Sequence, residues 1–212
     1  MIFEQIKNGG DRNLGYLVAD EKTKKAVAVD PSYRPGYYIQ RADELELELV
    51  SVICTHSHHD HVNGNDHLIE ELGIEVVMYK DAEYFYDIEL SDGEIFKLGG
   101  LELSIMHTPG HCEDGMCLLV EDKLITGDTL FVGKVGGTST EDEARKEYDS
   151  LKRLFTLDDE IEVFPGHDFG VNPSSTIGYE RENNPFILQA TFEDFLHLKE
   201  NWPAYKMEHN IP

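Results

Sequence analysis

The feature that most constrains this chain is a cluster of metal-binding side chains at the end of an apolar segment. Residues 55–61 read Thr-His-Ser-His-His-Asp-His, and the six residues before them are apolar apart from one serine. That pattern predicts a buried strand that ends where the cluster begins. Because side chains two apart in extended backbone point the same way, His56 and His58 can converge on one ion. Asp60 and His61 then turn toward a second ion. Imidazole and carboxylate groups are the ligands expected for zinc, non-haem iron or manganese.

Three further ligand candidates follow downstream, each where a short apolar run ends in a turn that contains glycine: His111, Asp128 and His167. Glycine lets the backbone approach closely and adopt positive φ, which helps to deliver a side chain into a crowded site. Any one of these residues alone would be interpreted as a capping aspartate or a hydrogen-bonded loop histidine. Together with the first cluster they make seven ligands, enough for two metal ions that share one carboxylate.

The order of these motifs resembles that of the metallo-β-lactamase-fold hydrolases. The family's His-x-His-x-Asp-His signature corresponds to residues 55–61, and the three downstream ligands follow in the family's order. Within the superfamily, Thr126–Phe131 and Pro165–Asp168 are similar to the glyoxalase II (hydroxyacylglutathione hydrolase) group. The tail segment Ser175–Pro185 is more similar to the short persulfide dioxygenases.

The resemblance implies an α+β fold, a four-layer αββα sandwich with the metals at one edge. It implies a single metallo-β-lactamase-like domain over residues 1–212, with a short helical tail at about 174–212. It also implies two divalent metal ions, with zinc as the expected metal and iron or manganese as alternatives. In that assignment Asp128 bridges the two ions, and each ion has three further ligands: His56, His58 and His111 for the first, and Asp60, His61 and His167 for the second.

Two such ions change the chemistry of a water molecule between them. They lower its pKa from ~15.7 toward 7, which makes a metal-bound hydroxide available at neutral pH. A thiolate is a stable leaving group, so a thioester needs little help from a general acid. We therefore predict a hydrolase that cleaves a small thioester, with a thiol-derived small molecule as substrate. Asp128 would hold the ions at their working separation, and Asp60 would orient the attacking water.

Two other functions remain open at this stage. A persulfide dioxygenase would hold a single Fe(II) with His56, His58, His111 and Asp128, and the short tail favours it. A metal-binding protein without turnover is the third alternative. Its site would have no open coordination position, whereas seven ligands for two ions leave room for water.

Contacts to the substrate are less clear from the sequence. Where the glyoxalase II group has a basic residue that binds glutathione, this chain has Gly137, and Lys134 is the nearby candidate to replace it. Phe169 stands where the group has a tyrosine after its last metal histidine. These differences leave the thiol carrier open, with Lys134 and Phe169 as the predicted substrate contacts.

The composition excludes several partners. With 18 basic and 42 acidic residues the net charge is −24, which disfavours nucleic acid and anionic membrane surfaces. The sequence has no run of 18 apolar residues and no basic-then-apolar start, so we expect neither a membrane span nor a secretory signal. We expect a cytoplasmic protein, either a monomer or a homodimer.

The remaining hydrophobic patterns predict secondary structure. A hairpin is predicted over residues 14–18 and 26–29, and helices over 81–87, 141–155 and 192–200. The last helix is expected to dock on the sandwich through its apolar side chains.

Overall fold

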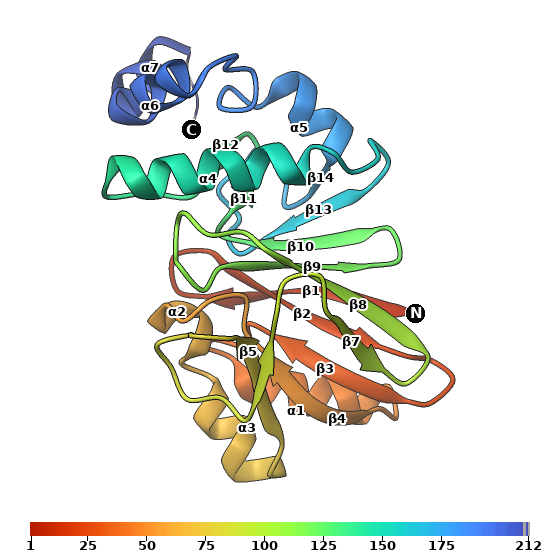
Figure 1. Cartoon of the computed structure of the whole chain (residues 1–212). Coiled ribbons are helices and arrows are strands. Elements are labelled where there is room, and N and C mark those ends of the chain that lie inside the picture. Colours follow the sequence, from red (N-terminus) through yellow and green to blue (C-terminus); the bar gives the residue numbers. More distant parts are fainter. Residues whose placement is uncertain (210, 212) are drawn as a thin grey trace.

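The computed structural model describes residues 1–209 and 211, which form four layers in the order helices, sheet, sheet, helices (Figure 1). Each sheet has six strands. The first sheet has the strand order β1 (Ile2–Gly9), β2 (Asn13–Ala19), β3 (Lys25–Val29), β4 (Glu48–Ile53), β5 (Glu75–Tyr79) and β6 (Ile88–Leu90). The second has the order β14 (Ser175–Thr176), β13 (Glu162–Pro165), β10 (Lys123–Gly127), β9 (Met116–Val120), β8 (Leu101–His107) and β7 (Ile95–Leu98). A separate ribbon pairs β11 (Leu130–Phe131) with β12 (Lys134–Val135).

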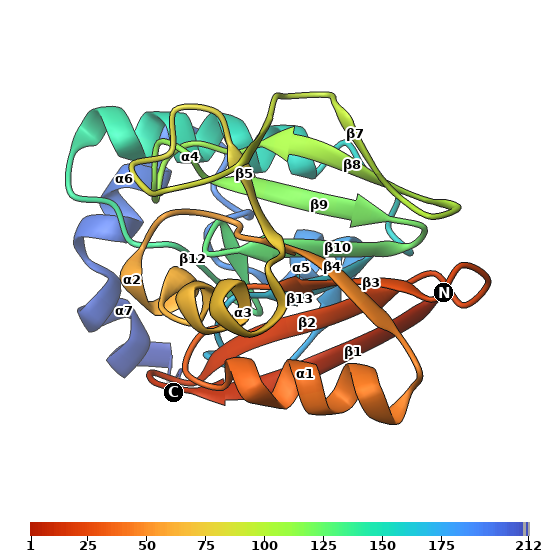
Figure 2. The same cartoon turned by 90° about the horizontal axis from the view of Figure 1, so that it is seen from below.

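Helices cover the outer face of each sheet. On the first sheet lie α1 (Pro35–Glu44) and α3 (Asn65–Leu72), which are in front in Figure 2, and the short α2 (His59–Val62) lies at the left-hand edge in Figure 1. On the second sheet lie α4 (Glu141–Leu154) and α5 (Ile177–Asn183), and α6 (Phe192–Glu200) and α7 (Trp202–His209) lie on the far side of α4 from the sheet. This arrangement confirms the predicted α+β class and the αββα sandwich.

The core lies on both sides of the first sheet, and β2 shows why. All seven residues of β2 are buried, and successive side chains of a strand point to opposite faces. Tyr16 and Val18 therefore pack between the two sheets, against residues such as Leu118 of the second sheet. Leu17 and Ala19 pack on the other side, beneath the helices. A strand buried on both faces reads as a continuous apolar run, and such a run predicted this strand.

Several predicted elements are confirmed. Residues 14–18 and 26–29 lie in β2 and β3, which pair antiparallel. The predicted helix at 141–155 is α4, which begins with a capping box between Thr140 and Glu143. The predicted helix at 192–200 is α6, and Phe195 on it is fully buried in the cluster between α4 and the second sheet.

The predicted helix at 81–87 is wrong, because this segment consists of turns and bends. Asp87 instead caps the start of β5, where its carboxylate accepts a 3.0 Å hydrogen bond from the Val76 amide. The helix α1 was missed, since its Pro35 and Gly36 suggested a loop. Proline suits the first turn of a helix, and Tyr38 anchors α1 by complete burial.

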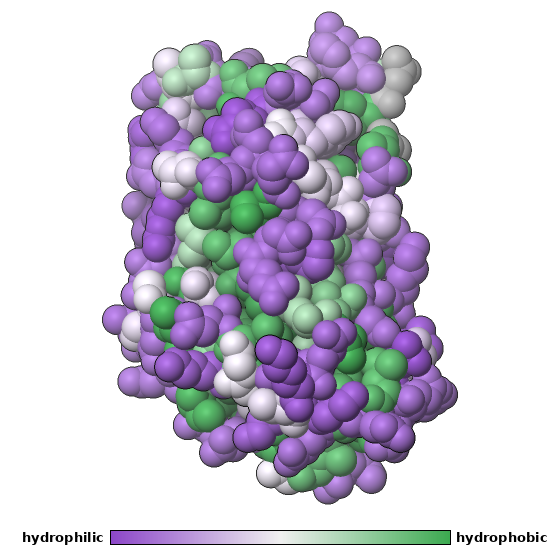
Figure 3. All heavy atoms as spheres, turned by 90° about the vertical axis from the view of Figure 1, so that its right-hand side faces the viewer, coloured by the Kyte–Doolittle hydropathy of each residue, from purple (hydrophilic) through white to green (hydrophobic). Residues whose placement is uncertain are grey.

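The surface agrees with the high net charge. Hydrophilic residues cover most of the face on the right-hand side of Figure 1, and hydrophobic residues gather near its middle (Figure 3). Among the described residues, no helix combines the length and apolar character needed to cross a bilayer.

Candidate metal centre

The predicted ligands meet at one edge of the sandwich, where several strands end. Backbone hydrogen bonds join the two sheets at this edge, from Met116 N to Thr55 O at 2.9 Å and from Leu14 N to Gly166 O at 2.8 Å. The ligands come from five elements or the loops that follow them: His56 and His58 after β4, Asp60 and His61 on α2, His111 after β8, Asp128 after β10 and His167 after β13.

Three histidines form the first ligand group. His58 Nδ1 lies 3.1 Å from His56 Nε2 and 3.0 Å from His111 Nε2. Ligand atoms held about 2.0–2.1 Å from one tetrahedral zinc lie roughly 3.3 Å apart. The group is therefore the right size for one ion, as the resemblance implied.

The second ligand group contains Asp60, His61 and His167. Asp60 Oδ2 lies 3.3 Å from His167 Nε2 and 3.8 Å from His61 Nε2. One ligand atom from each residue falls within 4.8 Å of the others. A second ion of similar size fits among them.

Asp128 lies between the two groups. Its Oδ2 is 3.5 Å from His111 Nε2 of the first group and 3.4 Å from His167 Nε2 of the second. Its Oδ1 is 3.4 Å from His61 Nε2. One carboxylate thus reaches both groups, which is the arrangement expected of a bridging ligand.

Backbone carbonyls fix the tautomers of two histidines. His111 Nδ1 donates to the carbonyl oxygen of Gly137 at 2.8 Å, and His167 Nδ1 donates to that of Asp11 at 2.8 Å. Since a carbonyl can only accept, both rings carry their proton on Nδ1 and turn Nε2 toward the site. Such partners behind metal ligands orient the ring and raise its basicity.

A buried carboxylate, Asp30, orients two more ligands. Its Oδ2 accepts from His61 Nδ1 at 2.9 Å and from the Thr55 hydroxyl at 2.7 Å. Because the Thr55 hydroxyl gives its proton to Asp30, its oxygen accepts from His56 Nδ1 at 3.1 Å. The Asp30 carboxylate therefore holds one histidine of each ligand group, with Nε2 of both turned inward.

Two buried atoms in the site lack partners, and this tests whether metal ions fit. His61 Nε2 and Asp128 Oδ1 are buried and face each other at 3.4 Å, but neither makes a hydrogen bond among the described residues. Buried polar atoms without a well-formed hydrogen bond are unfavourable. A divalent cation satisfies both atoms at once, so the residues present fit a metal centre.

The protonation states of His56, His111 and Asp128 suit metal binding. Burial lowers the pKa of His56 and of His111, so both rings are neutral near pH 7. Burial alone would raise the pKa of Asp128, but the charge of His61 and the hydrogen bonds from His167 and His61 together outweigh it, and the pKa of this carboxyl lies well below its usual range. Neutral imidazoles and an ionised carboxylate are the forms that bind metals.

The second ligand group holds protons in the absence of metal. Burial acts to lower the pKa of His61, but the carboxylates of Asp128 and Asp30 raise it well above its usual value. Burial is likewise outweighed at His167, whose bonds to Asp128 and Asp60 raise its pKa to about 10. A cation that enters this group must displace these protons.

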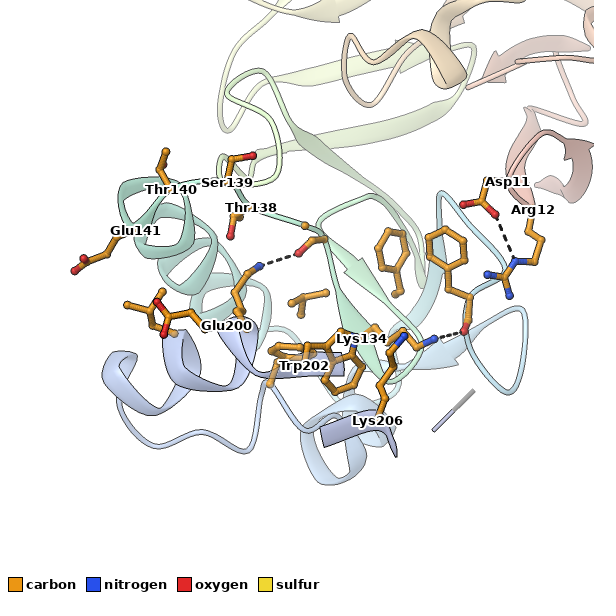
Figure 4. Close-up of a pocket in the computed structure, with 18 residues that line it drawn as sticks. Asp11, Arg12, Lys134, Thr138, Ser139, Thr140, Glu141, Glu200, Trp202 and Lys206 are labelled. Carbon is orange, nitrogen blue, oxygen red and sulfur yellow. Dashed lines mark hydrogen bonds and ion pairs between the residues drawn. The ribbon is translucent and has the colours of Figure 1, made fainter. Parts of the chain in front are cut away.

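A cavity of about 530 Å³ lies beside the site, and both predicted substrate contacts line it. The ring of Phe169 stacks on His167 with a centroid distance of 4.6 Å, and Lys134 Nζ donates to the Phe169 carbonyl at 2.8 Å. Figure 4 shows Arg12, Lys134 and Lys206 at one end of the cavity and Glu141 at the other.

The structure thus brings all seven candidate ligands together and places both predicted substrate contacts on the adjoining cavity. Sequence reasoning missed Asp30, although it follows β3 as the downstream candidates follow their strands. It also missed Asn13, whose side-chain amide donates to Asp60 Oδ2 at 3.0 Å, and Arg12, whose φ is 61°. No motif in the sequence marks these last two residues.

A comparison with protein families decides the lineage. The model of the metallo-β-lactamase superfamily matches residues 9–167, which include most strands of both sheets and all seven candidate ligands. The chain belongs to the metallo-β-lactamase superfamily. Members of this superfamily bind divalent metals, which agrees with the ligand groups described above.

Proteins that differ in their named functions resemble this chain. A probable polyketide biosynthesis zinc-dependent hydrolase of Bacillus velezensis is 33% identical over 88% of this chain and 87% of its own length. A hydroxyacylglutathione hydrolase of Francisella tularensis subsp. novicida is 34% identical over 76% of this chain and 65% of its own length. The crystal structure of ETHE1 from Myxococcus xanthus is 35% identical, with a TM-score of 0.90, over 95% of this chain and 91% of that one.

Proposed function

We propose that this superfamily member is a dinuclear metallohydrolase that cleaves a small thioester, as hydroxyacylglutathione hydrolases do. The observation that carries the proposal is the second ligand group. Asp60, His61 and His167 each offer a ligand atom within 4.8 Å of the others, as the first three histidines do, and His61 and His167 are anchored through Nδ1. The first group is large enough for one ion, so a second set of anchored ligand candidates supports a second ion.

When bound, two divalent ions supply a water of pKa near 7 and a Lewis acid for the carbonyl under attack. The protein residues supply the geometry. Asp128 reaches both groups and sets their separation. Asp60 is held by Asn13, which donates to its Oδ2 at 3.0 Å, and we propose that the free capacity of this carboxylate orients the attacking water.

The cavity supports a thiol-derived small molecule as substrate. Its volume of about 530 Å³ lies in the usual range for small-molecule sites, about 300–1,000 Å³. The aromatic rings of Phe131 and Phe169 wall its inner end beside His167, and an acyl group packs well there. Lys134, whose Nζ lies 2.8 Å from the Phe169 carbonyl oxygen, and Lys206 lie at one end of the cavity, and their charges suit an anionic group on the thiol carrier.

Zinc is the metal we propose, because the Bacillus velezensis relative carries a zinc-dependent name. The likeness to hydroxyacylglutathione hydrolase supports the thioester. The alignment covers only 65% of that relative's length. The rest of the relative has no counterpart in the alignment, so the likeness does not support glutathione as the thiol carrier.

A persulfide dioxygenase with a single Fe(II) is the second candidate. The observation that favours it is the likeness to ETHE1, which covers 91% of that chain with a TM-score of 0.90 and agrees with the resemblance of the tail. In that case the first ligand group and Asp128 hold the single iron ion, and the second ligand group binds no metal.

Metal analysis of the purified protein, followed by two assays, separates the candidates. Two zinc ions per chain with cleavage of a small thioester support the hydrolase. One iron ion per chain with O₂ uptake on a persulfide supports the dioxygenase. Hydrolysis that is unchanged after complete removal of metal contradicts both.

A further inference from the structure

One buried lysine of the tail reaches toward the metal centre. Lys199 lies on α6 with its side chain 10% exposed, and its ammonium group pairs with Glu147 of α4, whose side chain is 0% exposed. The same ammonium group donates a 2.8 Å hydrogen bond to the carbonyl oxygen of Gly136. A buried ion pair often contributes no net stability, because both charges lose their hydration. Stability therefore does not account for the Lys199–Glu147 pair.

The backbone that Lys199 holds is the one that orients a ligand. Gly137, directly after Gly136, accepts the 2.8 Å hydrogen bond from His111 Nδ1 that leaves Nε2 facing the site. Gly136 itself packs so closely that an added Cβ would overlap the Asp128 carbonyl oxygen and lie 2.8 Å from His111 Cβ. A small shift of this turn therefore moves the His111 ring.

Glu147 borders His111 from the other side. Gly110, which directly precedes His111, packs against the backbone and Cβ of Glu147 with no room for a side chain. Gly110 has a φ of 144°, which L side chains rarely adopt. The Glu147–Lys199 pair thus contacts both segments that flank His111. Glu147 packs on Gly110, and Lys199 donates to the Gly136–Gly137 segment.

We propose that Lys199 is a positioning residue for the metal centre. Held in place by Glu147, it fixes the Gly136–Gly137 turn and, through that turn, the Nε2 of His111. The inference rests on the proposed function, because it assumes that His111 binds a metal. It also gives the docked helix α6 a role in the site, although α6 supplies none of the seven proposed ligands.

Cobalt(II) is a suitable probe, because its visible absorption reports the geometry of its ligands. The variants are Lys199→Met, which removes the ammonium group, and the double variant Glu147→Gln/Lys199→Met, which also removes the unpaired charge. Lys152→Met, an exposed lysine on α4, is the control. We expect both variants that lack Lys199 to bind the first cobalt ion about tenfold more weakly and with an altered spectrum, the lower end of the effect of a group behind a metal ligand.

The double variant separates positioning from folding. It leaves no buried charge unpaired, so its melting temperature is expected to recover relative to Lys199→Met, while its cobalt spectrum stays altered. A double variant that recovers both the melting temperature and the wild-type spectrum would overturn the proposal. So would a wild-type spectrum with only KM changed, which would make Lys199 a substrate contact. If the wild-type protein binds no cobalt, the proposed function itself fails.

Discussion

Replacement of Asp30 by asparagine tests the orientation of the ligands most sharply. Asp30 is fully buried and accepts hydrogen bonds from Thr55 N at 2.8 Å, from the Thr55 hydroxyl at 2.7 Å and from His61 Nδ1 at 2.9 Å. Asparagine is the same size but has a single acceptor oxygen. If that oxygen keeps the bond from Thr55 N, the amide NH₂ faces His61 and forces its proton onto Nε2.

The structure sets the size of the expected effect. Loss of a group behind a metal ligand costs about 10- to 100-fold in metal affinity. His61 bonds Asp30 directly, so we expect the second ion to bind about 100-fold more weakly, or ~2.8 kcal/mol. His56 is held only through the Thr55 hydroxyl, so the first ion is expected to lose about tenfold, or ~1.4 kcal/mol.

A competition titration with a chelator measures both zinc affinities. Asp20→Asn is the matched control, because Asp20 also accepts three hydrogen bonds, from Gly100 N, Lys22 N and the Thr23 hydroxyl. It lies on the hairpin turn between β2 and β3, away from the ligands, so its variant is expected to keep both affinities. Two unchanged zinc affinities in Asp30→Asn would refute the reasoning.

Three further predictions follow from the site. Asp128→Ala is expected to lose both ions and activity together, since this carboxylate reaches both groups; full activity at unchanged metal content in a metal assay would disprove its role. Zinc affinity for the second ion is expected to rise with pH from 6 to 8, because the pKa of His167 is raised to about 10 without metal and its proton must leave; titrations that give a flat or falling affinity would contradict this. Lys206→Met removes one cation of the cavity and is expected to raise KM for an anionic thioester about 10-fold with kcat unchanged. The control Lys152→Met is expected to change neither KM nor kcat. Equal kinetics for both variants would show that Lys206 does not contact the substrate.

The sequence singled out the seven residues that the structure brings together because each one follows a local pattern. The His-x-His-x-Asp-His cluster follows an apolar strand, and the three later ligands stand at glycine turns. Two of those turns have the expected positive φ, at Gly110 and Gly127. Strands such as β2 were predictable for a related reason, because a strand buried on both faces is a continuous apolar run, whereas the four-layer sandwich was implied by the family resemblance.

The roles of Asn13 and Lys199 could not be predicted from the sequence, because their partners are distant along the chain. Asn13 contacts Asp60 across 47 positions, and Lys199 contacts Gly136 across 63, so only the tertiary fold brings these pairs together. Residues 81–87 were wrongly predicted to be a helix, because Tyr84 and Tyr86 pack on the first sheet from an irregular segment rather than from a helix face. Hydrophobic periodicity indicates which face of a helix or strand is buried, and it carries no information on contacts between distant segments.

We propose that this edge of the sandwich holds two metal ions with Asp128 between them. The decisive measurement is a crystal structure of the zinc-loaded protein with anomalous scattering recorded at the zinc edge. We expect two anomalous peaks about 3.5–4 Å apart, one beside His56, His58 and His111 and the other beside Asp60, His61 and His167. A single peak at saturating zinc, or a second peak outside these residues, would contradict it.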